Sequence, residues 1–380
     1  MNKEIIFLAN HITYFVSHRL AIAEKLKSLG YEVTVITGRK KKINENQCYS
    51  LVRSKGIKLE VVEHFAGTKN ILSLLTFLMF VIKMCRQNNN KILHCISTKS
   101  AIVGLAAAFI TRTEVVCSFS GLGLLFQKNG NRFFFKYKIF LIHCYFRFLL
   151  KFVTCRFIVQ NQQDKAKISE TFLVEESIIT LTKGSGVVLD DYVYNINVKR
   201  NVVLMASRLL KSKGVFEYIA ASKMLSNLYP DWTFLLAGEP DADSPDCVDY
   251  AELMRELENS NVEWIGHQAN LSEVLQSARI FTLPSYYNEG FPKVLIEASA
   301  CGCAIVTTNT PGCRDAINNG QNGILISPRS AEELFAAIEK LILDNSLSER
   351  LAKKSNHFAK LNFSIDDVFD KYIEVYHSFR

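Results

Sequence analysis

Short apolar runs alternate along the chain with longer stretches in which apolar residues recur every three or four positions, the pattern of an α/β protein. Glu4–Ala9 and Glu32–Thr37 are predicted strands, and His18–Leu29 between them is a predicted amphipathic helix that ends at Gly30. We expect a loop over Asn10–Ser17. This β-α-β opening contains no G-x-G-x-x-G sequence, so the usual fingerprint of a dinucleotide site is absent.

The remaining apolar runs extend this alternation along the chain. In the first half they predict strands at Leu59–Val62, Ile92–Ile96, Val115–Phe119, Arg156–Val159 and Ile178–Leu181. In the second half they predict strands at Asn201–Met205, Thr233–Gly238, Val262–Gly266, Ala278–Leu283, Ala304–Thr308 and Gly323–Ile326. Helical stretches separate the strands, among them Tyr250–Leu257, with a capping region near Asp246, and Ala331–Asp344. The alternation predicts parallel, doubly wound sheets.

A chain of 380 residues is long enough for two such domains. We expect an N-terminal domain over residues 1–190, a linker near residues 186–200, and a C-terminal domain over residues 191–365 that closes with the helix Ala331–Asp344. Residues 366–380 are expected to form a final helix, because Val368–Phe379 has one apolar face.

The formal net charge of +8 hides a difference between the two halves of the chain. Residues 1–190 contain 27 Lys and Arg against 12 Asp and Glu, whereas residues 191–380 contain 18 against 25. A basic half predicts an anionic partner on one side of the protein, and both nucleic acid and a membrane surface fit that description.

The stretch Asn131–Phe152 favours the membrane. It contains nine aromatic residues and five Lys or Arg, and no acidic residue occurs from Val115 to Gln163. Such a helix can bury Phe and Leu at the acyl boundary while its cations meet anionic head groups. Stacking on single-stranded nucleic acid, or a buried helix with snorkelling cations, would use the same residues. Because Phe and Leu dominate, we expect an anionic membrane surface as partner and no nucleic acid.

The protein is expected to lie on the membrane without crossing it. The second apolar run, Ile71–Ile82, has only twelve residues before Lys83 and is too short to span a bilayer. The ten cysteines are scattered, and none forms a C-x-x-C pair or a zinc-ligand cluster. Because Met1–Asn10 has no signal peptide, we expect reduced thiols in a cytoplasmic, peripheral protein.

Two glutamates eight positions apart define the main candidate site. Glu289 lies in a predicted loop after a strand, and Glu297 lies in a helix that begins near Pro292. In open α/β sheets, ligands bind at the carboxyl ends of strands. Gly290 lets the backbone approach a ligand, the N–H groups at the helix start suit a phosphate, and carboxylates accept hydrogen bonds from sugar hydroxyls. Two solvated glutamates on an ordinary strand–loop–helix are the alternative.

A second candidate site follows the strand Asn201–Met205. Arg208 and Lys213 lie in A-S-R-L-L-K-S-K-G, on a loop that leads into a helix near Gly214. A guanidinium group and an ammonium group at a helix N-terminus could clamp a diphosphate. A basic surface turn is the alternative.

Two loops of the N-terminal half are candidates for binding an acceptor. His18 and Arg19 follow the first predicted strand and could hold a diphosphate or a sugar; a helix N-cap at Ser17 with exposed His18 and Arg19 is the alternative. Ser120 and Gly121 lie in S-F-S-G-L-G after a later strand, where a plain turn is the alternative.

These sequences resemble the motifs of retaining family-4 glycosyltransferases. S-Y-Y-N-E-G-F-P-K-V-L-I-E-A resembles the family's E-x7-E motif, and A-S-R-L-L-K-S-K-G resembles its R-L-x-x-x-K-G, with Ser207 in place of a glycine. K-G-S-G-V at Lys183–Val187 and P-G-C-R-D at Pro311–Asp315 resemble the branch that assembles bacterial capsule and O-antigen on undecaprenyl diphosphate. The resemblance covers nearly the whole chain and is strongest over residues 201–330.

The resemblance implies a role for each candidate residue. Glu289 would meet the donor sugar and Glu297 the ribose, while Arg208 and Lys213 would neutralise the leaving diphosphate. Glu289, Arg208 and Lys213 are therefore the candidate catalytic residues. The candidate donor-binding residues are Arg208, Lys213, His267, Glu289, Gly290, Phe291, Pro292, Lys293, Val294, Leu295 and Glu297. The candidate acceptor-binding residues are His18, Arg19, Ser120 and Gly121; relatives often have a sugar-contacting His where this chain has Ser120.

The resemblance also implies a fold and an activity. The fold would be GT-B, with two facing Rossmann-like domains and a cleft between them. The final helix, residues 366–380, would pack back on the N-terminal domain. The activity would be retaining transfer of a sugar, an N-acetylhexosamine such as GalNAc, from a UDP-sugar to an undecaprenyl-diphosphate-linked acceptor on the cytoplasmic face of the inner membrane. No metal or other cofactor is expected, because Arg208 and Lys213 can carry the diphosphate charge. A sugar-nucleotide 2-epimerase, a glycosyltransferase for free sugars and a non-catalytic nucleotide-sugar-binding scaffold remain alternatives.

Overall fold

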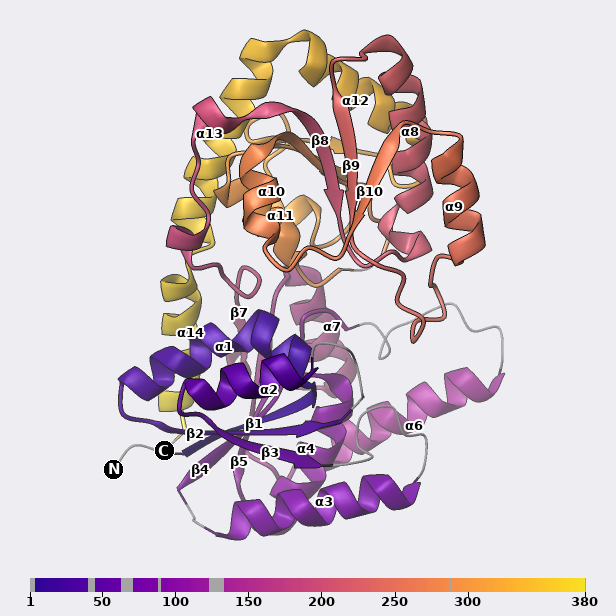
Figure 1. The fold of residues 1–380 in the computed structure, drawn as a ribbon. Coiled ribbons are helices and arrows are strands. Elements are labelled where there is room, and N and C mark those ends of the chain that lie inside the picture. Colours follow the sequence, from indigo (N-terminus) through magenta and orange to yellow (C-terminus); the bar gives the residue numbers. More distant parts are fainter. Residues whose placement is uncertain are drawn as a thin grey trace. The chain divides into compact units, whose positions relative to one another are not determined.

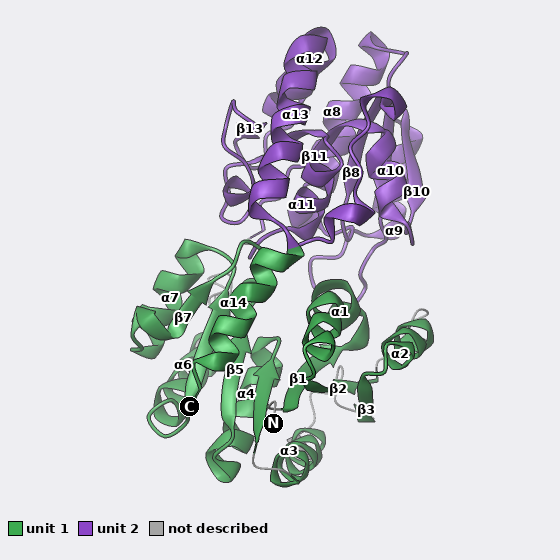
Figure 2. Ribbon diagram, turned by 90° about the vertical axis from the view of Figure 1, so that its left-hand side faces the viewer, with its two compact units in different colours: residues 1–185, 365–380 green, residues 186–364 purple. Residues whose placement is uncertain are grey.

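The computed structural model describes residues 4–39, 45–62, 71–87, 90–122, 133–287 and 289–379. The chain divides into two compact units, one of residues 1–185 with 365–380 and one of residues 186–364 (Figure 2). The first unit thus ends at Ser185, where the sequence suggested residue 190, and the chain returns to it at Ile365. Asn131 and Arg132 of the predicted membrane stretch, and Asn288 of the glutamate loop, lie outside the described residues.

The first unit contains a seven-stranded sheet in which all paired strands are parallel (Figure 1). Its strands are β1 (Glu4–His11), β2 (Glu32–Gly38), β3 (Lys58–Val62), β4 (Lys91–Cys95), β5 (Glu114–Ser118), β6 (Cys155–Val159) and β7 (Ile179–Leu181). The order across the sheet is β3-β2-β1-β4-β5-β6-β7. The direction of winding therefore reverses between β1 and β4, which creates a topological switch point at their carboxyl ends.

Alternate residues of these strands pack against helices on opposite faces of the sheet. Ile6 and Leu8 belong to the core under α3 (Ile71–Arg86), α4 (Thr98–Thr111), α6 (Phe133–Leu149) and α7 (Gln162–Phe172). Ile5 and Phe7 belong to the core under α1 (Ile12–Ser28), α2 (Glu45–Ser54) and α14 (Ile365–His377). The two-residue period of a strand thus produces two cores from one continuous apolar run.

The predicted loop over Asn10–Ser17 is wrong, because α1 begins at Ile12 directly after β1. Ile12 and Phe15 are both buried and lie three positions apart, so they belong to one face of a helix. The N-cap residue is His11, and its side chain makes no capping hydrogen bond. The alternative cap at Ser17 is therefore also wrong, and the start of α1 lacks the capping residue that would have marked it in the sequence.

The second unit contains a six-stranded parallel sheet with the order β10-β9-β8-β11-β12-β13. Its strands are β8 (Arg200–Ala206), β9 (Thr233–Ala237), β10 (Val262–Gly266), β11 (Ala278–Leu283), β12 (Ala304–Thr308) and β13 (Gly323–Ile326). Its helices are α8 (Val215–Leu228), α9 (Tyr250–Glu258), α10 (Leu271–Ser277), α11 (Lys293–Ala300), α12 (Ala331–Leu343) and α13 (Asn345–Asn362). Winding reverses between β8 and β11, so this sheet has its switch point at the carboxyl ends of those two strands.

Two expectations about the helices of this unit are wrong. The helix Ala331–Asp344 does not close the domain, because Asp344 accepts a hydrogen bond from the Leu347 N–H and caps the further helix α13. The buried face of α13 includes Ser348 and Ser355, which hides the apolar period of the helix in the sequence. The N-cap of α9 is Asp249, which lies three positions after Asp246, where the capping region was expected.

Over residues 4–39, 45–62, 71–87, 90–122, 133–287 and 289–379, no helix is long and apolar enough to cross a membrane. The apolar run that starts at Ile71 forms α3, a helix of 16 residues. The stretch that starts at Asn131 forms α6, a helix of 17 residues.

Candidate active site

The strongest candidate residues follow the two central strands of the second sheet. Arg208 and Lys213 lie between β8 and α8, and Glu289 lies between β11 and α11. Because β8 and β11 are hydrogen-bonded neighbours on either side of the switch point, their carboxyl ends meet at one edge of the sheet. The structure therefore places the two sequence motifs side by side.

Backbone contacts hold the two loops together. Gly214 has a φ of +80°, and a Cβ atom there would lie 2.3 Å from the carbonyl oxygen of Pro284, so this close approach needs a glycine. The Ser212 carbonyl oxygen accepts hydrogen bonds from the Tyr286 N–H at 2.8 Å and the Ser285 hydroxyl at 3.2 Å. These contacts fix the positions from which Lys213 and Glu289 extend.

Lys213 and Glu289 form an ion pair. Each side chain is only 12% exposed, and the Ser285 hydroxyl oxygen lies 3.1 Å from the Glu289 carboxylate oxygen that pairs with Lys213. The Lys213 ammonium group also lies 5.7 Å from the centroid of the Tyr287 ring. A cation suited to a phosphate thus lies next to a carboxylate suited to sugar hydroxyls.

Arg208 is anchored by an acidic segment whose role sequence reasoning missed. Its Nη1 atom donates to the Asp241 carboxylate at 2.8 Å, while 62% of the Arg208 side chain remains exposed. Asp246, in the same segment, accepts hydrogen bonds from both the N–H, at 2.9 Å, and the hydroxyl of Ser212. Two carboxylates of one acidic segment therefore hold this loop, Asp241 through Arg208 and Asp246 through Ser212, next to Lys213.

Asp241 and Asp243, in the same segment, are spaced as D-x-D, and two carboxylates at this spacing could suggest a metal site. In the part of the chain that the structure describes, no three His, Cys, Asp or Glu side chains are grouped so that they could hold a metal ion. The Asp241 carboxylate instead pairs with the Arg208 guanidinium group.

Glu297 is nearly buried, and both of its described partners reach the same oxygen. Its Oε1 atom accepts a hydrogen bond from the Tyr192 hydroxyl at 2.8 Å and pairs with the Lys293 ammonium group at 2.8 Å. Burial and the Glu297 carboxylate raise the pKa of the Tyr192 phenol above its usual range, so Tyr192 keeps its proton and donates. Tyr192 was not predicted to belong to the site, because it lies 105 positions from Glu297.

Pro292 is the N-cap residue of α11, with a φ of −65°, and its side chain makes no capping hydrogen bond. The P-G-C-R-D loop closes on the other side: a Cβ atom at Gly312 would lie 2.7 Å from the carbonyl oxygens of Glu289 and Gly290. The predicted phosphate position at the start of α11 is thus bordered by backbone from two loops.

The remaining donor-binding candidates occupy different environments. Phe291 packs edge-to-face against Phe363 with ring centroids 5.3 Å apart, and Leu295 is fully buried. Their side chains belong to the core, although their positions between the two glutamates made them candidates. Val294 is half-buried, and His267 is exposed just after β10, the strand at the edge of the sheet.

The first unit brings the acceptor candidates together as well. The Tyr14 hydroxyl contacts the Ser120 hydroxyl, and Nη2 of Arg19 lies 3.5 Å from the same oxygen. The His18 ring stacks on Tyr14 with centroids 4.3 Å apart. Gly121 follows with a φ of +123°. Residues from α1 and from the end of β5 therefore form one polar cluster, and it includes Tyr14, which was not a candidate from the sequence.

Arg19 itself is only 1% exposed, contrary to the alternative in which it lies on the surface. Its Nη1 atom donates to the His18 carbonyl oxygen at 2.8 Å, and its guanidinium carbon lies 5.7 Å from the centroid of the Tyr372 ring. Among the described residues, its Nε atom has no hydrogen-bond partner. A buried guanidinium group whose described contacts include no carboxylate is well suited to an anion.

Behind this cluster, α14 contributes to a second buried network. The His94 ring accepts and donates hydrogen bonds with the hydroxyls of Tyr376 at 2.6 Å and Ser118 at 2.8 Å, and it is fully buried. It stacks between Phe7 and Tyr372, with centroid distances of 5.0 and 5.5 Å. The C-terminal helix thus supports the strand end that precedes Ser120.

Comparison with known families agrees with this arrangement of two units. Residues 4–161 match the family model described as glycosyl transferase 4-like, and residues 190–358 match the model described as glycosyl transferases group 1. The chain therefore belongs to the GT-B glycosyltransferases, with a family-4-like domain followed by a group 1 domain. It is a glycosyltransferase, as the sequence motifs predicted.

Two curated relatives are similar over most of their length. The N,N'-diacetylbacillosaminyl-diphospho-undecaprenol α-1,3-N-acetylgalactosaminyltransferase of Campylobacter jejuni is 28% identical over 97% of both chains. The capsular polysaccharide biosynthesis glycosyltransferase CapM of Staphylococcus aureus is 24% identical over 88% of this chain and 91% of its own.

Solved structures share the fold at lower identity. HepE of Anabaena, in complex with UDP and glucose, has a TM-score of 0.80 at 18% identity, with all of both chains covered. Sucrose-phosphate synthase of Thermosynechococcus elongatus has a TM-score of 0.80 at 17% identity over 99% of both chains. The predicted GT-B fold class is confirmed.

Proposed function

We propose that the protein is a retaining glycosyltransferase that moves an N-acetylhexosamine, such as N-acetylgalactosamine, from a UDP-sugar to an undecaprenyl-diphosphate-linked acceptor. The observation that carries the proposal is the ion pair of Lys213 with Glu289 at the switch point of the second sheet, with Arg208 on the same loop. One ligand with a diphosphate next to a sugar would use all three side chains.

The named relatives support the choice of donor and acceptor. The Campylobacter relative is named for N-acetylgalactosamine transfer and for a diphospho-undecaprenol substrate. HepE was crystallised with UDP-glucose as well as with UDP and glucose. The proposed pathway is accordingly the assembly of capsule, O-antigen or a related lipid-linked glycan, in which CapM also takes part by name.

In the proposed mechanism, the donor's diphosphate is the leaving group. Arg208 and Lys213 stabilise the negative charge that develops on it. Glu289 accepts hydrogen bonds from sugar hydroxyls and orients the ring, and Glu297 accepts a hydrogen bond from the ribose. The acceptor hydroxyl attacks on the face that the diphosphate leaves and gives its proton to a departing phosphate oxygen, so the anomeric configuration is retained.

The acceptor's diphosphate is the anion that we propose for Arg19. Among the described residues, the Nε atom of the buried guanidinium group has no hydrogen-bond partner, and the group lies beside Ser120 and the His18 carbonyl oxygen. Burial in a low dielectric strengthens the attraction of such a group for phosphate. His18, stacked on Tyr14, would border the first sugar of the acceptor.

A contact with the anionic cytoplasmic face of the inner membrane through residues 131–152 is part of the proposal. Among the described residues of α6, the side chains of Tyr137 and Phe140 are 53% and 59% exposed. Metal independence is proposed as well, because Arg208 and Lys213 supply positive charge at the diphosphate. Full turnover in EDTA would support it, and restoration of lost turnover by Mg²⁺ or Mn²⁺ would overturn it.

A nucleotide-release assay tests the function. Purified protein is given UDP-, GDP- and dTDP-sugars, with and without an undecaprenyl-diphosphate-linked sugar in detergent. We expect release of UDP that depends on the lipid acceptor and is lost in Arg208→Ala. A new UDP-sugar formed without acceptor would instead identify a 2-epimerase, and UDP-sugar binding without turnover under any acceptor would identify a scaffold.

A further inference from the structure

The outer face of the first unit formed by α3, α4 and α6 combines two properties. Its exposed large apolar side chains include Leu75 and Met79 on α3, Phe109 and Ile110 on α4, and Phe148 on α6. In the sequence from residue 64 to residue 163, the only acidic residue is Glu114. An exposed apolar area of this extent indicates an apolar partner. Because none of the three helices carries an acidic side chain, the face also favours an anionic partner.

Contacts among the helices make this face continuous. Phe109 of α4 lies 6.3 Å from Phe148 of α6, measured between ring centroids, and 5.7 Å from Phe152 just beyond α6. Phe148 and Phe152 are in turn 5.3 Å apart. Phe152 is 63% exposed, so this aromatic cluster faces solvent and is not part of the core.

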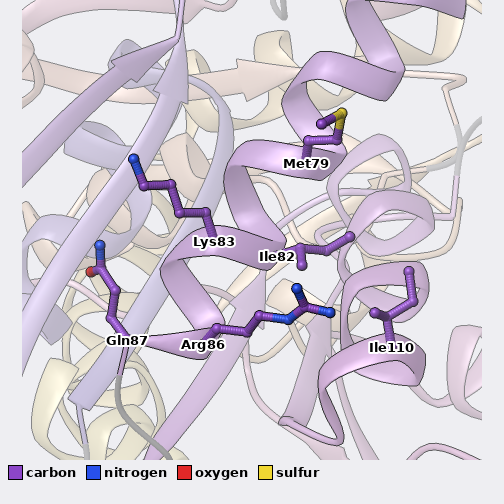
Figure 3. Close-up of a pocket in the computed structure, with 6 residues that line it drawn as sticks. All are labelled: Met79, Ile82, Lys83, Arg86, Gln87 and Ile110. Carbon is purple, nitrogen blue, oxygen red and sulfur yellow. The ribbon is translucent and has the colours of Figure 1, made fainter.

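A groove lies on the same face, between the C-terminal ends of α3 and α4. It has a volume of about 460 Å³ and is lined by Met79, Ile82, Lys83, Arg86, Gln87 and Ile110. Figure 3 shows Ile82 and Arg86 extending from α3 toward Ile110, while Lys83 and Gln87 project together from the other edge of α3. The lining of the groove therefore combines three apolar side chains, Met79, Ile82 and Ile110, with two cations, Lys83 and Arg86.

We infer that this groove binds the phosphate head group of an anionic phospholipid while the α3–α4–α6 face lies on the bilayer surface. The inference rests on the membrane contact in the proposed function and extends it from α6 to two further helices. Lys83 and Arg86 are exposed and, within the described ranges, have no acidic partner, so their charge is available to a phosphate. Met79 and Ile110 would contact the glycerol and the first acyl carbons of the bound phospholipid.

The opposite face of the same sheet provides an internal contrast. There α1 and α14 carry acidic residues that form ion pairs with lysines, such as Asp366 with Lys25 and Glu24 with Lys55. These carboxylates would repel an anionic surface, or their ion pairs would have to break. An anionic membrane should therefore bind the α3–α4–α6 face rather than this one.

Vesicle sedimentation tests the face. Wild-type protein is expected to bind phosphatidylcholine vesicles that contain phosphatidylglycerol, and to bind pure phosphatidylcholine much less. The double variant Lys83→Gln, Arg86→Gln should bind the vesicles that contain phosphatidylglycerol roughly thirtyfold more weakly, because it loses the attraction of two cations to an anionic surface. The control pair Lys353→Gln with Lys354→Gln, exposed on α13, removes the same charge from the other unit and should bind as wild type does.

Binding of water-soluble dihexanoyl-phosphatidylglycerol, measured by calorimetry, tests the groove itself. One-to-one binding that is lost in the Lys83→Gln, Arg86→Gln variant supports the inference, provided that the variant melts at the wild-type temperature. No saturable binding, or equal binding by the variant, overturns the groove. Turnover with a short-chain acceptor in detergent should be unchanged, so failure here is distinct from failure of the proposed glycosyl transfer.

Discussion

Lys213 and Glu289 form an ion pair that joins the loop after β8 to the loop after β11, and each side chain is 12% exposed. In the proposed function, Lys213 contacts the donor's diphosphate and Glu289 contacts the hydroxyls of its sugar. The diphosphate would then compete with the Glu289 carboxylate for the Lys213 ammonium group. Lys293 with Glu297 and Arg208 with Asp241 repeat this arrangement nearby.

Glu289→Gln should lower kcat/KM about ten- to hundredfold, the value of a hydrogen bond to a charged group. The amide keeps the shape of the side chain but no longer carries the charge that holds Lys213. Steady-state UDP release measures the effect, and a thermal melt of the variant checks its folding. Unchanged turnover would remove Glu289 from the proposed mechanism.

Arg208→Ala should lower kcat about a hundred- to thousandfold, as when one preorganised donor is removed from a site of developing charge. Arg208→Lys should recover only part of the rate, because an ammonium group lacks the planar fork of a guanidinium group. Arg255→Ala, an exposed site on α9, is the matched control. Equal rates for Arg208→Ala and this control would contradict the assignment.

Asp241→Asn should tighten UDP binding by up to about fivefold, since it removes a negative charge that competes with the diphosphate for Arg208. The gain should shrink at high salt. Asp243→Asn removes the same charge two positions away and should change the Kd for UDP less. Weaker binding in Asp241→Asn would mean that the carboxylate chiefly orients the guanidinium group.

Gly214→Ala should destabilise the protein and raise the KM for donor. The substitution places a side chain at a φ of +80° and against the Pro284 carbonyl oxygen. Gly320→Ala is the matched control, because Gly320 has a φ of +74° and a Cβ atom added there would meet no atom within 4 Å. The control variant should lose about 1 kcal/mol of unfolding free energy from backbone strain alone. Any larger loss in Gly214→Ala measures the contact between Gly214 and the Pro284 loop.

His94 should make the protein less stable in mild acid. Burial, reinforced by the charge of Arg19, holds the pKa of His94 well below its usual value of 6.5. Below that value the unfolded chain takes up a proton that the folded chain does not, so up to about 1.4 kcal/mol of stability is lost per pH unit. Above pH 6.5 the ring is neutral in both the folded and the unfolded chain, so His94 adds no further pH dependence to the stability.

Thermal melts from about pH 7.5 to about pH 5 measure this loss. His94→Gln lacks the titrating ring and should show a smaller decrease over the same range, although it begins from lower stability. A wild-type stability that rises as the pH falls through this window would contradict the assignment.

The sequence was sufficient for the strands and for the pairing of the two motifs. Ala278–Leu283 is a largely apolar run, and runs of this kind are buried on both faces of a parallel sheet. Such a strand can be located in the sequence before its neighbouring strands are known. The resemblance of both motifs to those of family-4 glycosyltransferases then assigned Arg208 and Glu289 to one site.

Other parts of the site depend on contacts between distant positions. Tyr192 reaches Glu297 across 105 positions, and Arg19 reaches Ser120 across 101. No local pattern encodes such pairs. Arg19 also reverses the usual expectation for its residue type, because a full positive charge is rarely buried without a carboxylate. Its described neighbours include Ser120 and tyrosines from α1 and α14, Tyr14 and Tyr372.

The placement of α14 in the first unit has a consequence for synthesis on the ribosome. The first unit is begun before the second, yet its core lacks Tyr372 and Tyr376 until the second unit has been made. During that interval His94 would lack Tyr376 and Arg19 would lack Tyr372, while residues 186–364 already form a complete unit. The second unit is therefore expected to fold first, although it emerges later, and a stalled or nicked chain should leave the first unit as the target of chaperones and proteases.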